Sequence, residues 1–141
     1  MIEKHNARVI AMATSATGMP QDAAERVQNA KEIVERVLSK GVPLGDIFVD
    51  ATVFPISVDS QTGNHYFDAV RAIRVEYGDK IHIGMGLSNV SFGMPNRTLI
   101  NQAFIHLAID AGIDGGLIDP VQTKLQAIFD LDLDSERVKS A

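Results

Sequence analysis

The chain has 141 residues, 45% hydrophobic and 22% charged, with no cysteine and a formal charge of −5 at pH 7. This composition is ordinary for one globular domain, and it excludes disulfides, thiolate nucleophiles and cysteine-ligated metal centres within the chain. Its 13 basic residues are scattered among 18 acidic ones, which argues against nucleic-acid binding. No apolar run suits a membrane span and no signal-peptide pattern opens the chain, so we expect a cytoplasmic protein that acts on a small molecule.

Strand-like and helix-like segments alternate from the start of the chain. An apolar strand is predicted over residues 8–13, and Asp22 with Glu25 forms a capping box at the start of an amphipathic helix. The second predicted strand covers residues 47–50 and is apolar until its last residue. A helix with an apolar stripe over residues 66–77 follows it, and a glycine ends that helix.

The second half of the chain repeats the pattern. A strand is predicted over residues 81–86, and Asn96 can cap the helix that carries apolar residues from 100 to 111. Residues 113–118 read as a short strand interrupted by glycines. Asp119 and Pro120 then supply a cap and a first-turn proline for a last helix.

Predicted strands that start at residues 8, 47, 81 and 113 indicate four parallel β/α units. Such units make either half of a (β/α)₈ TIM barrel or a small open sheet. The first strand is not followed by a glycine-rich phosphate loop, which favours the half barrel of the α/β class. A half barrel has unpaired edge strands and an uncovered inner face. We therefore expect another polypeptide, a second copy or an unusual closure to cover it.

Polar side chains stand where two predicted strands end. Asp50 ends the second strand, and its carboxylate can accept two parallel hydrogen bonds from a ligand or, equally well by position, cap the following turn. Asn89 follows the third strand within the run Gly84–Arg97, and its carboxamide suits a polar heterocycle whose protonation changes during a reaction. The alternative for Asn89 is a local role in holding a tight loop.

The run Gly84–Arg97 resembles the signature of the pterin-binding methyltransferases that pass a methyl group from methyltetrahydrofolate to a corrinoid. These include the corrinoid iron-sulfur protein methyltransferase and the folate domain of cobalamin-dependent methionine synthase. The resemblance covers residues 8–120 but only the latter half of the family's barrel. It implies a dihydropteroate-synthase-like fold in which residues 1–141 are a C-terminal half-barrel.

The same resemblance implies a methyltransferase of one-carbon metabolism, with methyltetrahydrofolate as methyl donor. The acceptor would be the Co(I) of cobalamin or another corrinoid on a partner protein, and a second half-barrel or a homodimer would complete the barrel. Asp50 would bind the pyrimidine edge of the pterin, and Asn89 would act catalytically beside N5. Gly86, Ser88 and Arg97 would complete the substrate-binding set, although Ser88 also suits a loop-orienting role and Arg97 a helix start.

The chain departs from the family pattern in ways that leave alternatives open. Ser15 and Ala16 stand where several members carry an acidic pair, and the pocket residues of the family's first half-barrel have no counterpart here. A non-catalytic half-barrel that serves as an interaction module is therefore a second hypothesis. A dihydropteroate-synthase-like pterin binder is a third, disfavoured because Ser88-Asn89-Val90 replaces that enzyme's Ser-Arg-Lys. No histidine pair has ligand spacing, so we expect no metal site.

Overall fold

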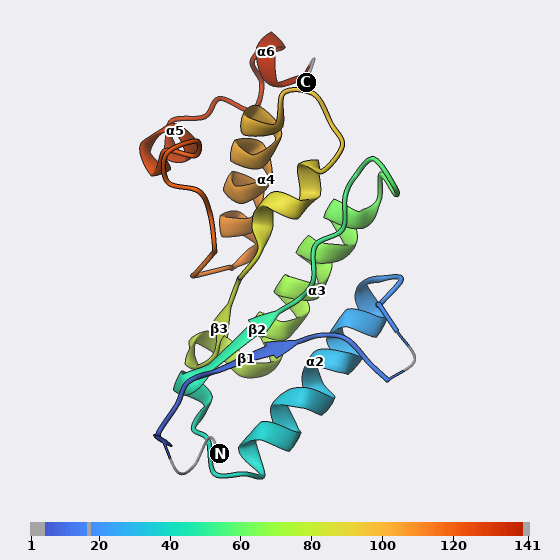
Figure 1. The fold of residues 1–141 in the computed structure, drawn as a ribbon, viewed down its shortest axis with the longest axis vertical. Helices are drawn as coiled ribbons and strands as arrows, with labels where there is room; N and C mark the ends of the chain where they lie inside the picture. Colours follow the sequence, from blue (N-terminus) through green and yellow to red (C-terminus); the bar gives the residue numbers. More distant parts are fainter. Residues whose placement is uncertain (1–4, 17, 140–141) are drawn as a thin grey trace.

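The computed structural model describes residues 5–16 and 18–139 (Figure 1). Its centre is a parallel sheet in the order β1-β2-β3, and a long helix follows each strand along the chain. The strands are β1 (Val9–Met12), β2 (Ile47–Asp50) and β3 (His82–Ile83). The long helices are α2 (Ala23–Leu38), α3 (Thr62–Tyr77) and α4 (Arg97–Ala111). The shorter helical segments are η1 (Leu44–Asp46), η2 (Gly78–Lys80), η3 (Leu87–Ser91), α5 (Leu125–Phe129) and α6 (Glu136–Lys139).

The two faces of the sheet differ. Helices α2 and α3 lie behind the sheet in the view of Figure 1, and the strand residues that point to them, such as Ile47 and Val49, are fully buried. On the other face Ile10 is 56% exposed and Met12 is 49% exposed. Side chains alternate between faces along a strand, so the half-buried Asp50 shares the open face with these two residues.

Helix α2 begins as the sequence predicts. The Asp22 carboxylate accepts a hydrogen bond from the Glu25 N–H at 2.9 Å. Glu25 Oε2 accepts one from the Gln21 N–H at 2.8 Å, so the return bond of the capping box reaches the residue before the cap. The helix then packs a stripe that includes Ala30 and Val34 into the core.

The prediction of a fourth strand is wrong. Residues 113–118 run beside β3 but form only an isolated parallel bridge, between Gly86 and Leu117. The N–H groups of Asp114 and Leu117 donate to the carbonyls of Ile83 and Met85, each at 3.0 Å. A regular ladder fails because the Asp114 side chain takes the Ile83 N–H, and because Met85 has a φ of 97°, which is incompatible with an extended strand.

Two predicted helix starts also need correction. Asn96 lies at the N-cap of α4, but it has a left-handed backbone with φ 54°, and its side chain makes no capping hydrogen bond. The last helix does not start at Asp119-Pro120. Asp119 Oδ1 accepts the Val121 N–H at 2.9 Å and so caps a turn, and α5 begins only at Leu125.

The α/β class and the parallel order of the first three strands are confirmed, and a sheet with one helix-covered face is consistent with part of a barrel. Within residues 5–16 and 18–139, no helix is long and apolar enough to cross a membrane.

Candidate functional site

The carboxyl ends of β2 and β3 meet at one edge of the sheet, and two loops leave from there. One loop, residues 51–56, follows β2, and the other is η3 with its flanking residues. Asn89 Nδ2 donates to the Val53 carbonyl at 2.6 Å, and the Ile56 N–H donates to the Val90 carbonyl at 2.9 Å. These bonds join the loop after Asp50 to the loop that carries Asn89, so both predicted site residues belong to one connected surface.

Asp50 is half-buried at the tip of β2. Its Oδ1 accepts the Thr52 N–H at 2.9 Å, and that is the one hydrogen bond of its carboxylate within the described part of the chain. Burial raises the pKa of Asp50, and the Thr52 N–H partly offsets this rise by stabilising the charged form. A carboxylate with an oxygen to spare and incomplete solvation is primed to accept hydrogen bonds from a ligand.

Asn89 and Gly86 are exposed at the same edge. With Asn89 Nδ2 bound to Val53, Oδ1 has no partner among the residues that the structure describes. A Cβ added at Gly86 would meet nothing within 4 Å, so the chain's own packing does not demand a glycine there.

Arg97 braces the loop that carries Asn89. From the first residue of α4 its Nε donates to Ser91 Oγ at 3.0 Å, and its Nη2 donates to the Ser88 carbonyl at 3.2 Å. Ser91 is fully buried, and its hydroxyl also donates to the Ser88 carbonyl at 3.2 Å. In this arrangement Ser88 contributes its backbone rather than its hydroxyl, and Arg97 ties η3 to α4.

The sequence interpretation missed Arg26. It is 0% exposed in the first turn of α2, and its Nε donates to the Thr52 carbonyl at 3.3 Å, directly beneath the loop after Asp50. Helical periodicity offered a signal, because Arg26 continues the stripe of Ala30, Val34 and Val37, all of which are buried.

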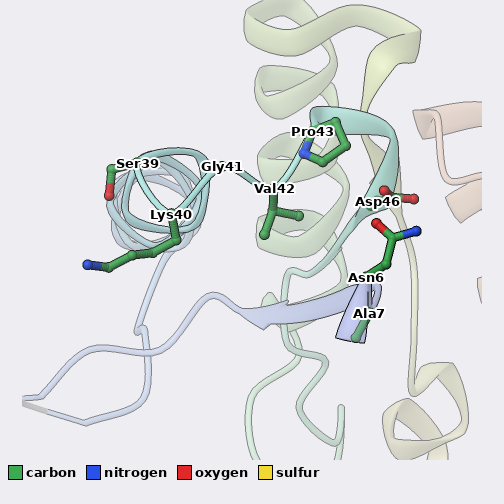
Figure 2. A pocket seen from close by; sticks show the side chains of 8 residues that line it. All are labelled: Asn6, Ala7, Ser39, Lys40, Gly41, Val42, Pro43 and Asp46. Carbon is green, nitrogen blue, oxygen red and sulfur yellow. The ribbon is translucent and has the colours of Figure 1, made fainter. Parts of the chain in front are cut away.

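Four cavities of the described residues have linings that include neither Asp50 nor Asn89. Figure 2 shows one of about 370 Å³ where strands β1 and β2 begin, lined by residues such as Asn6, Pro43 and Asp46, with the Lys40 side chain pointing away from Asp46. An apolar hollow of about 190 Å³ lies between α3, α4 and η3. This hollow is lined by Ile56 and Val90, the residues whose backbones join the two site loops, so it borders the candidate site although neither Asp50 nor Asn89 lines it.

Near the opposite end of the sheet His82 forms a polar cluster. Its Nδ1 lies 2.8 Å from Asp114 Oδ2, and its ring stacks on Phe48 at 4.5 Å between centroids. Burial opposes ionisation of Asp114, but the Ile83 N–H, His82 and Arg74 outweigh it and lower the pKa of that carboxyl. Across the described residues no group of three or more histidine, aspartate or glutamate side chains could hold a metal ion.

Comparison with known proteins agrees with the class that the fold and the strand-end site suggest. The family described as pterin binding enzyme matches residues 1–119, and the chain belongs to that family. It is 33% identical over 125 residues to the methylcorrinoid:tetrahydrofolate methyltransferase of Eubacterium limosum. The aligned region covers 88% of this chain but 46% of that protein, so the chain spans about half the length of the curated relative it matches.

Proposed function

We propose that the chain supplies one half of a methyltransferase that exchanges a methyl group between N5 of tetrahydrofolate and the cobalt of a corrinoid protein. The observation that carries the proposal is the shared edge of Asp50 and Asn89, whose loops are joined by the bond from Asn89 to the Val53 carbonyl. The barrels of α/β proteins bind their substrates at the carboxyl ends of the parallel strands, and this acid and this amide lie at such ends.

Asp50 would bind the pyrimidine edge of the pterin. That edge presents a ring N–H beside an exocyclic amine, which matches the two oxygens of one carboxylate. The Thr52 N–H occupies one lone pair of Oδ1 and fixes the carboxylate orientation. Because burial leaves the carboxylate poorly solvated, each hydrogen bond from the pterin would be worth more than at an exposed site.

Asn89 would act at N5. Since Nδ2 is held by the Val53 carbonyl, Oδ1 is the atom left to accept a hydrogen bond from a protonated N5. A bond to that proton favours the positively charged nitrogen, which is the better leaving group when a methyl group departs. The exposed Gly86 leaves room for the ring to approach, and Arg97 keeps the loop in place.

The corrinoid is a substrate on another protein, and its cobalt would accept or supply the methyl group. In transfer from methyltetrahydrofolate, the N5–C bond breaks with its electron pair left on nitrogen, and the cobalt nucleophile supplies the pair of the new bond. The name of the relative puts the methylcorrinoid first. The same residues would serve both directions, because forward and reverse transfer share one transition state. The chain's own residues bind, orient and handle the proton at N5.

A second half-barrel would cover the open face of the sheet. The exposed Ile10 and Met12 are apolar side chains on a face that a closed barrel would bury, and the chain matches 46% of its relative. We propose that another polypeptide or a second copy supplies the missing wall, and that residues 1–141 form the C-terminal half-barrel. If the face stays uncovered and the protein has no affinity for folate, the hypothesis of a non-catalytic interaction module is favoured instead.

Calorimetry with methyltetrahydrofolate tests the proposal on the full chain with any half-barrel that copurifies. Asp50→Asn keeps the shape but removes the charge, and we expect it to weaken the Kd about 10- to 100-fold, since hydrogen bonds to charged groups contribute roughly 1.5–3 kcal/mol. Asp46→Asn is the matched control, because Asp46 lies at the opposite end of the sheet, where its carboxylate pairs with Arg8 at 3.5 Å. Wild-type protein that binds no better than Asp50→Asn would refute the assignment.

A further inference from the structure

Arg26 is a charged side chain with no exposed surface, an uncommon position for an arginine. It rises from the first turn of α2 toward the loop that follows Asp50. We infer that Arg26 is a positioning residue: it holds residues 52–54 in the conformation that presents Asp50 and Asn89 to the ligand. This inference rests on the proposed function, which it deepens.

Three contacts fix the guanidinium. Nε donates to the Thr52 carbonyl at 3.3 Å, and Nη1 donates to the Asp22 carbonyl at 2.8 Å. The Phe54 ring covers it, with Cζ 5.1 Å from the ring centroid. The guanidinium therefore connects the N-cap residue of α2 to two residues of the loop. A lysine ammonium has a single nitrogen and cannot make the same set of contacts.

The loop needs such a support. Thr52 has a φ of 55°, a left-handed conformation that is rare for a β-branched residue. The N–H of the same residue donates to Asp50 Oδ1, and the next carbonyl, that of Val53, accepts Asn89 Nδ2. Arg26 thus acts on both predicted site residues through one peptide segment.

A purely packing role does not explain the guanidinium. Burial lowers the pKa of Arg26, although the charges of Asp22, Asp59 and Glu25 oppose this, and Nη2 is buried without a hydrogen-bond partner in the described part of the chain. Apolar side chains of similar volume fill buried sites without these costs. The bonds to two carbonyls are what an apolar residue would lose.

The test compares Arg26→Lys with Arg36→Lys, a control on the exposed side of the same helix. Hydrogen exchange of residues 51–56 in the full chain should be about tenfold faster in Arg26→Lys and unchanged in the control. Unchanged exchange in Arg26→Lys would overturn the inference. This readout needs no folate, so it remains decisive even if the wild-type protein fails to bind folate and the proposed function falls.

The pH dependence of methyltetrahydrofolate binding separates positioning from general stability. Burial raises the pKa of Asp50 and the Thr52 N–H lowers it, so a released loop alters both effects and shifts that pKa. The pH at which binding is half lost should therefore differ between Arg26→Lys and wild type, whereas a shared midpoint would contradict the inference. If Arg26→Lys does not fold, Phe54→Leu is used instead, because it removes only the covering ring. Faster exchange of the loop in that variant would support the inference, and unchanged exchange would overturn it.

Discussion

Gly84→Ala tests the close approach between β3 and the segment of residues 113–118. A Cβ on Gly84 would lie 1.9 Å from the Gly115 carbonyl oxygen and 2.5 Å from its carbon, so the segment must move by more than about 1 Å. Such a shift breaks the bonds from the Asp114 and Leu117 N–H groups to the Ile83 and Met85 carbonyls. Two hydrogen bonds at about 1 kcal/mol each, plus about 1–3 kcal/mol of overpacking, give a predicted loss of about 3–5 kcal/mol.

Urea denaturation of the full chain, followed by circular dichroism, measures this loss. Gly115→Ala is the matched control from the same contact, because a Cβ on Gly115 would meet nothing within 4 Å. We expect its free energy of unfolding to stay within about 1 kcal/mol of wild type. A Gly84→Ala protein as stable as the control would refute the packing of these two backbones.

Three further predictions concern single side chains. Tyr66→Phe removes a hydroxyl that is buried and has no partner in the described residues, so thermal denaturation should show equal or higher stability, by up to about 1 kcal/mol; a loss of that size would contradict this. The pKa of Asp114 is lowered from its ordinary value of 3.8, so the ionised carboxylate stabilises the fold at any pH above that value. This contribution is lost as the pH falls through the lowered pKa. Urea midpoints of Asp114→Asn should therefore fall less on acidification than those of wild type, and parallel curves would count against this. Arg97→Met should speed hydrogen exchange in η3, whereas Arg71→Met, which breaks an exposed ion pair, should leave it unchanged; equal effects would show that Arg97 does not brace the loop.

Local chemistry was sufficient to predict the elements that one stretch of sequence specifies. The capping box at Asp22 and the strand that ends at Asp50 depend on residues within a few positions of each other, and both are observed. The positions of Asp50 and Asn89 at one edge followed from the geometry of parallel strands.

The features that sequence did not reveal depend on contacts between distant segments. Asp114 takes the Ile83 N–H and so prevents a regular fourth strand, a competition between residues 31 positions apart. Asn96 looked like a side-chain cap, but its left-handed backbone brings its carbonyl, rather than its side chain, to the first turn of α4. Arg26 was not predicted as a site residue because its contacts with Thr52 and Phe54 are made to another β/α unit.

Nuclear magnetic resonance of isotope-labelled full chain titrated with methyltetrahydrofolate tests the central claim most directly. If the pterin binds where β2 and β3 end, the backbone resonances of Thr52 and Val53 and the side-chain NH₂ of Asn89 will shift together with increasing folate. Resonances around the 370 Å³ cavity, such as those of Lys40 and Asp46, will stay in place. Saturable shifts confined to that cavity, with the strand-end resonances unmoved, would contradict the account.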